Sequence, residues 1–281
     1  MRWTLAEFLF EMNVDQKRRT LFVEGNRDIS FWKRFVPVVD RGDTVVYPIS
    51  IIHIDGIAGG ERGRLFAFAD VISRSAVSAR VFFFADADCD RILNRQPPEN
   101  IVLTDGRDLE SYLLFDDGLE ELTCEMFGRS TAEFASVDVE LHNIARPMGV
   151  LRTLSEQNGL KLPFQHVLSE DGGKRFTSAQ KKEPRTINML RLVDSLVRQG
   201  NYAPQYAAEI FNIFGDLLSA TNAVPNAQII HGKDLINVLS WYFDCKADAM
   251  TAVVFATVAA RRDDLMELPS LNKTQAWIRQ L

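Results

Sequence analysis

The chain has 281 residues, of which 46% are hydrophobic and 10% are aromatic. That is enough apolar material to build one large domain or two small ones around a packed core. The formal net charge of −6 argues against a protein that coats nucleic acid nonspecifically, because such binding depends on many lysine and arginine contacts to phosphate. It does not exclude a nuclease, since a bound cation locally reverses the field of an acidic site.

The N-terminal stretch and the cysteines indicate the compartment. Residues 1–11 carry acidic side chains within an apolar pattern, which excludes a secretory signal, and no apolar run reaches membrane-spanning length. We therefore expect a cytoplasmic protein with no membrane partner. Cys89, Cys124 and Cys245 are odd in number and far apart, so we expect reduced thiols rather than disulfides or a zinc ribbon.

Up to about residue 115, apolar runs alternate with amphipathic stretches. Strands are expected at 20–24, 44–54, 80–85 and 100–104, and helices at 29–38 and 61–74. This rhythm predicts an α/β fold with a mostly parallel, Rossmann-like sheet flanked by helices. Asp28 is a candidate N-cap for the first helix, which would turn Trp32 and Phe35 inward. Pro48 lacks a backbone donor, so its strand is expected at a sheet edge or on a bulge.

Beyond residue 115 the periodicity becomes helical. Helices are expected near 116–127, 137–158, 187–199, 204–220, 233–243 and 246–264. We therefore divide the chain into a first domain, 1–115, and a mainly α-helical domain, 116–281, for partner docking, dimerisation or substrate contact.

The stretch from 163 to 186 has the composition of a long surface loop. It gathers five basic residues: Lys174, Arg175, Lys181, Lys182 and Arg185. These form either a solvated loop or a loop that contacts phosphate. A glycine-rich turn at Gly56, Gly59 and Gly60 lacks the ending of a nucleotide-binding loop and is read as plain turn chemistry.

Acidic residues follow each of the four expected strands. They are Glu24, Asp55, Asp86 with Asp88, and Asp105. In open α/β sheets, ligands gather at the carboxyl ends of the strands. Unpaired carboxylates packed side by side repel one another, so their concentration at this edge predicts a site for a hard cation.

Asp86 and Asp88 are the strongest candidate pair. Strand residues two apart project on one face with a spacing of about 7 Å, which one hydrated Mg²⁺ can bridge. The alternative is a loop in which these acids cap the next helix. Glu24 favours the metal site, because it ends another strand, is followed by Gly25 for a tight turn, and would face the same cavity.

Two groups of motifs carry a family resemblance. Residues 22–28, Phe-Val-Glu-Gly-Asn-Arg-Asp, followed by Asp86-x-Asp88, resemble the TOPRIM domain of topoisomerases, primases and OLD-type nucleases over about residues 18–115. Residues 103–114 and the sequence His-Gly-Lys-Asp-Leu at 231–235 resemble the DUF4435 branch of that superfamily. This branch includes the TOPRIM effector of PARIS anti-phage systems, which works beside an ABC-type ATPase.

The resemblance implies a nuclease with a TOPRIM fold. Asp86 and Asp88 would be ligands of Mg²⁺, with Mn²⁺ as an alternative, and Glu24 a ligand or a proton-transfer group. It further implies a toxic effector of abortive anti-phage defence that an ABC-type ATPase partner holds inactive, and a homodimer formed through the helical half.

Further candidates follow the fourth strand. Asp108-Leu109-Glu110 matches the acidic motif that helps hold a second metal in OLD-like nucleases. On this basis Glu110 is the expected second-site ligand, while Asp108 suits either metal binding or an N-cap. Asp90 and Asp105 are weaker candidates. Tyr112 sits in an apolar run and is expected in the core.

Lys233 lies in the motif at 231–235, where it could point at phosphate or at the acidic cluster. Asp234, with a buried helix behind it, fits a capping role equally well. Lys233 is therefore a candidate catalytic residue.

Three functions fit these residues. The leading one is a Mg²⁺-dependent nuclease that acts on tRNA, other RNA or DNA. The enzymatic alternative is a nucleotide-sugar glycosyltransferase with an Asp-x-Asp segment that holds Mn²⁺ on a diphosphate, but it gives no reason for Glu24 at the end of the first strand. The non-enzymatic alternative is an interaction or sensor module.

Overall fold

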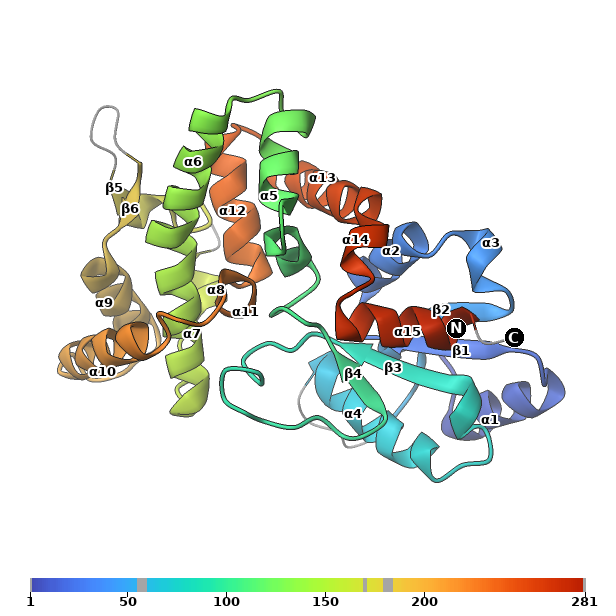
Figure 1. Cartoon of the computed structure of the whole chain (residues 1–281). Coiled ribbons are helices and arrows are strands. Elements are labelled where there is room, and N and C mark those ends of the chain that lie inside the picture. The colour runs from blue at the N-terminus through green and yellow to red at the C-terminus, as the bar shows by residue number, and fades with distance from the viewer. Residues whose placement is uncertain (1, 55–59, 169–170, 179–183, 280–281) are drawn as a thin grey trace. The chain divides into compact units, whose positions relative to one another are not determined.

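The computed structural model describes residues 2–54, 60–168, 171–178 and 184–279 (Figure 1). Asp55, most of the expected glycine-rich turn, and Lys181 and Lys182 of the basic cluster lie outside these residues. The chain forms two compact units. The first comprises Met1–Ala87, Arg95–Leu109 and Val258–Leu281, and the second comprises Asp88–Asn94 and Glu110–Thr257.

The first unit is built on a four-stranded parallel sheet in the order β2-β1-β3-β4. Its strands are β1 (Arg19–Val23), β2 (Thr44–Pro48), β3 (Val81–Ala85) and β4 (Ile101–Leu103). All neighbouring pairs run parallel, which confirms the predicted α/β class. β2 is an edge strand and Pro48 is its last residue, so the missing donor of proline removes no inner ladder bond.

Helices cover both faces of this sheet. On one face, α1 (Leu5–Val14) and α4 (Gly60–Ser73) contribute Phe8 and Phe68, whose rings pack edge-on against Phe22 of β1 at 5.4 and 5.1 Å. On the other face, α2 (Asn26–Phe35) brings Trp32 to 4.9 Å from Phe84. These large buried rings are the core of the unit, and each contributes about 1.5–3 kcal/mol by its removal from water.

Capping explains where α1 and α2 begin. Thr4 and Glu7 form a capping box, and the hydrogen bonds from Thr4 hold the pKa of the Glu7 carboxyl below its ordinary value. At α2 the expected N-cap was wrong. Gly25 is the N-cap, and Asp28, three residues on, accepts its backbone N–H at 2.8 Å. The helix therefore starts earlier than its apolar pattern indicated.

The C-terminal helix belongs to the first unit. α13 (Ala247–Ala260) and α14 (Arg262–Leu265) lead into α15 (Pro269–Arg279), whose Trp277 stacks on Phe82 of β3 at 5.0 Å. The expected boundary at residue 115 therefore differs from the division of the chain, because residues 258–281 return to the first unit. The physical reason is that β3 also carries an aromatic side chain on the face opposite α1 and α4, and α15 supplies the cover for it.

Helices dominate the second unit, as the periodicity predicted. The longer ones are α6 (Thr131–Glu140), which continues through a wide turn at Leu141–Ala145 into α7 (Arg146–Gln157), α9 (Met189–Gln199), α10 (Tyr206–Ala220) and α12 (Gly232–Tyr242). Shorter ones are α5 (Gly118–Glu121), α8 (Phe164–Val167) and α11 (Asn226–Ile229). Within the described ranges, no helix is both long and apolar enough to cross a membrane.

The described residues of the stretch expected as a surface loop include regular secondary structure. It contains α8, a helical turn at Lys174–Phe176 and strand β5 (Thr177–Ser178), which pairs with β6 (Thr186–Ile187). Arg175 donates to the carbonyl of Val167 at 2.6 Å, and Arg185 forms an ion pair with buried Glu140 at 3.2 Å. Both arginines therefore make contacts that stabilise the second unit. This disfavours the hypothesis that the segment is a loop that contacts phosphate.

Candidate functional site

The candidate site lies at the topological switch point of the sheet. From β1 the sheet continues to β2 on one side, and from β3 to β4 on the other, so the strand order reverses between β1 and β3. In open α/β sheets, ligands bind in the crevice outside the carboxyl ends of the strands at this point. Glu24 directly follows β1 and Asp86 directly follows β3.

The backbone brings Glu24 and Asp86 together. β1 and β3 pair in the register Phe22 with Phe83, and continuing this register by two residues sets Glu24 beside Ala85. The Glu24 carboxylate then accepts the backbone N–H of Asp86, with 3.1 Å between Oε1 and N. The Glu24 carboxylate and the Asp86 backbone therefore meet at one edge of the sheet, and a site shared by the two carboxylates stays a prediction.

Arg62 provides a cation at this edge, and the search for carboxylates missed it. It lies in the first turn of α4, where its Nη1 is 3.5 Å from Glu24 Oε1 and also donates to the backbone carbonyl of Asp86. Its guanidinium stands over the Phe66 ring at 4.8 Å. The side chains of Arg62 and Glu24 are 21% and 20% exposed, so solvent reaches the pair. Its signal in the sequence is an arginine just after the glycine-rich turn.

Thr104 and Asp105 fix the neighbouring end of β4. Thr104 Oγ1 accepts the backbone N–H of Ala87 at 2.8 Å and donates to the carbonyl of Gly106 at 3.0 Å, which ties the segment after β3 to that after β4. Asp105 is buried, and its carboxylate accepts the backbone N–H of Ser270 at 3.2 Å and its hydroxyl at 2.5 Å. Asp105 therefore anchors the start of α15. These hydrogen bonds explain why an acidic side chain is buried here without a bound metal.

The predicted strand geometry for Asp86 and Asp88 is wrong. β3 ends at Ala85, so both residues lie beyond it and their side chains do not share a strand face. Asp88 has a φ of +48°, the left-handed region that non-glycine residues rarely adopt, and it opens a series of turns that runs to Asn94. Asp88 and the half-buried Asp90 belong to the second unit, whereas Asp86 belongs to the first.

Asp108 and Glu110 are both buried, at 5% and 9% exposure. Asp108 lies in a bend of the first unit, and Glu110 begins a short 3₁₀ helix, Glu110–Leu114, in the second. Tyr112 in that helix is fully buried, which confirms its core role. A carboxylate this deeply buried requires hydrogen bonds or a positive charge beside it. The roles of Asp108 and Glu110 as ligands of a second metal stay predictions.

Lys233 is an exposed residue in the first turn of α12 in the second unit. The N-cap of this helix is His231, whose Nδ1 accepts the backbone N–H of Lys233 at 3.1 Å. The capping role considered for Asp234 is wrong. Asp234 is buried and forms a bidentate ion pair with Arg152, at 2.7 and 2.8 Å. The motif at 231–235 thus has a structural use in holding α12 to α7.

The donor set of the switch point suits Mg²⁺. Among the described residues, no three His, Cys, Asp or Glu side chains gather as a complete ligand set. Mg²⁺ does not require one, because it is commonly held by one or two carboxylates together with waters and substrate phosphates. Glu24 and Asp86, which directly follow two adjacent strands, are the candidate carboxylates, and Arg62 shows that a cation is accommodated beside Glu24.

In the described part of the chain, Cys89, Cys124 and Cys245 form no disulfide. Burial raises the pKa of the Cys245 thiol above its ordinary value, which makes it a weak nucleophile at neutral pH.

Comparison with models of protein families and with curated proteins finds no match for this chain.

Proposed function

We propose that the chain is a Mg²⁺-dependent nuclease of the TOPRIM type that hydrolyses phosphodiester bonds of RNA, such as tRNA, or of DNA. One observation carries the proposal: Glu24 and Asp86 meet at the switch point of a parallel sheet, with a cation on the Glu24 carboxylate. This is the place where α/β sheets bind ligands, and the chemistry there is that of carboxylates poised for a hard cation.

Glu24 and Asp86 would hold the metal. When bound, Mg²⁺ would polarise the scissile phosphate and lower the pKa of a coordinated water. The backbone N–H of Asp86 orients the Glu24 carboxylate through the hydrogen bond at 3.1 Å, so one of its oxygens is fixed before any ligand arrives. Asp88, Asp108 and Glu110 are proposed as supporting acids, on the resemblance.

Arg62 has two partners in this scheme. Without metal, its guanidinium balances Glu24. A metal that takes over the carboxylate would release the guanidinium, which suits the planar, bidentate recognition of a phosphate. Arg62 is therefore the proposed phosphate ligand of the site. Lys233 stays a candidate for the same task.

The glycosyltransferase alternative is less well supported. It would use Asp86-x-Asp88 alone and gives no role to Glu24, whose carboxylate is bonded to the Asp86 backbone. A role as the toxic effector of anti-phage defence, kept inactive by an ABC-type ATPase, and dimerisation through the helical part rest on the family resemblance.

The test is cleavage of tRNA, single-stranded DNA and duplex DNA by the full chain with Mg²⁺, Mn²⁺ or EDTA. Glu24→Gln and Asp86→Asn keep the side-chain shape and remove the charge. Asp70→Asn, on an exposed acid of α4, is the matched control. We expect metal-dependent cleavage that the first two variants lose and the control keeps. Cleavage that persists in both would exclude this site, and a folded wild type that cleaves nothing would favour an interaction module.

A further inference from the structure

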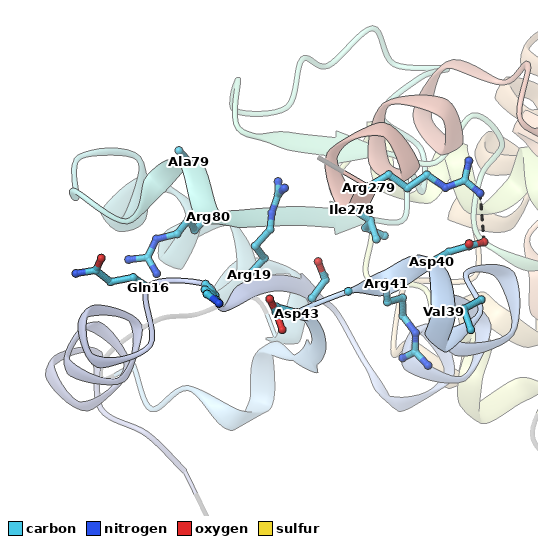
Figure 2. Close-up of a pocket in the computed structure, with 13 residues that line it drawn as sticks. Gln16, Arg19, Val39, Asp40, Arg41, Asp43, Ala79, Arg80, Ile278 and Arg279 are labelled. Carbon is cyan, nitrogen blue, oxygen red and sulfur yellow. Dashed lines mark hydrogen bonds and ion pairs between the residues drawn. The ribbon is translucent and has the colours of Figure 1, made fainter. Parts of the chain in front are cut away.

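A second candidate site lies at the opposite edge of the same sheet. A cavity of about 690 Å³ is lined by residues just before β1, β2 and β3 and by the end of α15 (Figure 2). Parallel strands start at one edge, so these segments converge there. A strand of five residues spans about 17 Å, so this cavity and the Glu24–Asp86 edge cannot hold the same phosphate group.

The cavity is basic in an acidic chain. Its cationic lining residues are Lys17, Arg19, Arg41, Arg80 and Arg279, and its acidic ones are Asp40 and Asp43. Asp40 is already engaged, because its Oδ2 lies 3.2 Å from Arg279 and 3.3 Å from Arg262; Figure 2 draws the first of these contacts. Asp43 is then the remaining acid of the lining for Lys17, Arg41 and Arg80. The whole chain, in contrast, has six more acidic than basic residues, 38 against 32.

Several of these cations have no carboxylate partner. Over the described residues, Lys17 and Arg41 form no ion pair, and Arg41 Nε is buried without a hydrogen-bond partner. Arg80 donates to the backbone carbonyl of Asp15 at 3.0 Å, which supplies a dipole but no charge. Arg41 and Arg80 are half-buried and Lys17 is exposed. Because half-buried cations without a compensating charge are costly, the cavity favours an anion.

The geometry of the side chains indicates phosphate. Guanidinium groups match phosphate oxygens bidentately, and lysine adds a point charge. Arg19 is held in place by stacking on Trp277, with 4.1 Å between its Cζ and the ring centroid. Val39 is 89% exposed at the rim and offers an apolar contact for a base or sugar. The volume is within the range of about 300–1,000 Å³ that is typical of small-ligand pockets.

We propose that this cavity binds a nucleotide phosphate chain, with Lys17, Arg41 and Arg80 as its ligands, at a site separate from the Glu24–Asp86 edge. Two sources share this chemistry: a free nucleoside triphosphate, and consecutive phosphates of single-stranded nucleic acid. The proposal does not depend on nuclease activity, since it concerns binding at another edge of the unit.

The test measures binding of two probes by the full chain in EDTA, which keeps metal away from Glu24. One probe is a fluorescent ATP analogue, and the other is a labelled single-stranded oligonucleotide. Arg41→Glu and Lys17→Glu each reverse a lining charge, and Arg41→Gln removes one more gently. Lys33→Glu, on an exposed residue of α2, is the matched control. Thermal melting checks that each variant is folded.

We expect each charge reversal to weaken binding about ten-fold or more, and the control to change it less than about two-fold. Competition by ATP identifies a nucleotide site. Binding of the oligonucleotide alone, with a salt dependence whose slope falls by about 0.7 per lost contact, identifies a nucleic-acid site. The proposal is wrong if neither probe binds the wild type, or if Lys33→Glu weakens binding as much as the cavity variants do.

Discussion

Replacing Arg62 by glutamine should tighten metal binding and slow cleavage at the same time. In the metal-free protein, Arg62 Nη1 lies 3.5 Å from Glu24 Oε1, so a metal has to displace a positive charge from its own ligand. Coulomb's law gives this pair about 1 kcal/mol at the dielectric constant of water and about 5 kcal/mol at an effective value of about 20.

Both side chains are about one-fifth exposed, so we take the low end of that range, about 1–2 kcal/mol. Arg62→Gln removes this competing interaction and should therefore lower the Kd for Mg²⁺ about 5–30-fold, as measured by isothermal titration calorimetry. Arg62→Lys, which keeps the charge, should change the affinity less. Arg64→Gln, which breaks an ion pair with Glu61 on the same helix, is the control.

Cleavage should respond in the opposite direction. If Arg62 moves to the scissile phosphate, Arg62→Gln removes that charge and lowers kcat even with metal saturating. A variant that binds metal more weakly than the wild type would refute this reasoning, because Arg62 would then be positioning Glu24 for the metal rather than competing with it.

Three further predictions concern stability. Asp234→Ala leaves Arg152 without its buried partner and should lower the free energy of unfolding by about 3–5 kcal/mol in urea denaturation, and an unchanged midpoint would contradict the ion pair. Asp105→Ala removes the hydrogen bonds to Ser270 and should cost about 1–3 kcal/mol, with earlier proteolysis of the C-terminal helix as a second readout. The pKa of Glu133 is lowered in the fold by hydrogen bonds from its capping serine, so its contribution is complete above its ordinary pKa of 4.5 and is lost as the pH falls through the lower folded value. The difference in Tm between wild type and Glu133→Gln should therefore shrink from about pH 6 to about pH 3, and a constant difference would exclude this linkage.

The local sequence pattern located all four strands of the first unit, but the strand expected over 44–54 was too long, because β2 ends at Pro48 and a 3₁₀ helix follows at Ile49–Ile51. Runs such as 81–85 are apolar without interruption, and only a strand buried on both faces needs such a run, so β3 was found with an error of one residue. Pro48 similarly identified an edge strand, because the constraint is a missing donor within the residue itself.

Features that depend on distant contacts were not predictable in this way. The order of strands decides that Glu24 and Asp86 share the switch point, and no local period encodes that order. α15 escaped detection because its buried face includes polar residues such as Thr274 and Gln275, which mask its amphipathic pattern. The place of α15 in the first unit depends on the hydrogen bond from Ser270 to Asp105, and these two residues are 165 positions apart in the sequence.

Asp88 and Arg62 were misjudged for different reasons. Asp88 was assigned by the alternation of a strand that in fact ends at Ala85, and its left-handed backbone is a property of the turn that follows. Arg62 was overlooked because a metal site was sought among acids alone, although a carboxylate at a strand end needs a counter-charge when no metal is bound.

The most direct test of the account replaces one non-bridging oxygen of the scissile phosphate by sulphur in the substrate that the wild type cleaves. Sulphur is a softer ligand than oxygen and binds Mg²⁺ poorly. The account predicts slow cleavage of one diastereomer with Mg²⁺, recovery with the softer Mn²⁺, and no recovery in Glu24→Gln. Equal rates for oxygen and sulphur substrates in both metals would contradict a metal held at Glu24 and Asp86 on the phosphate.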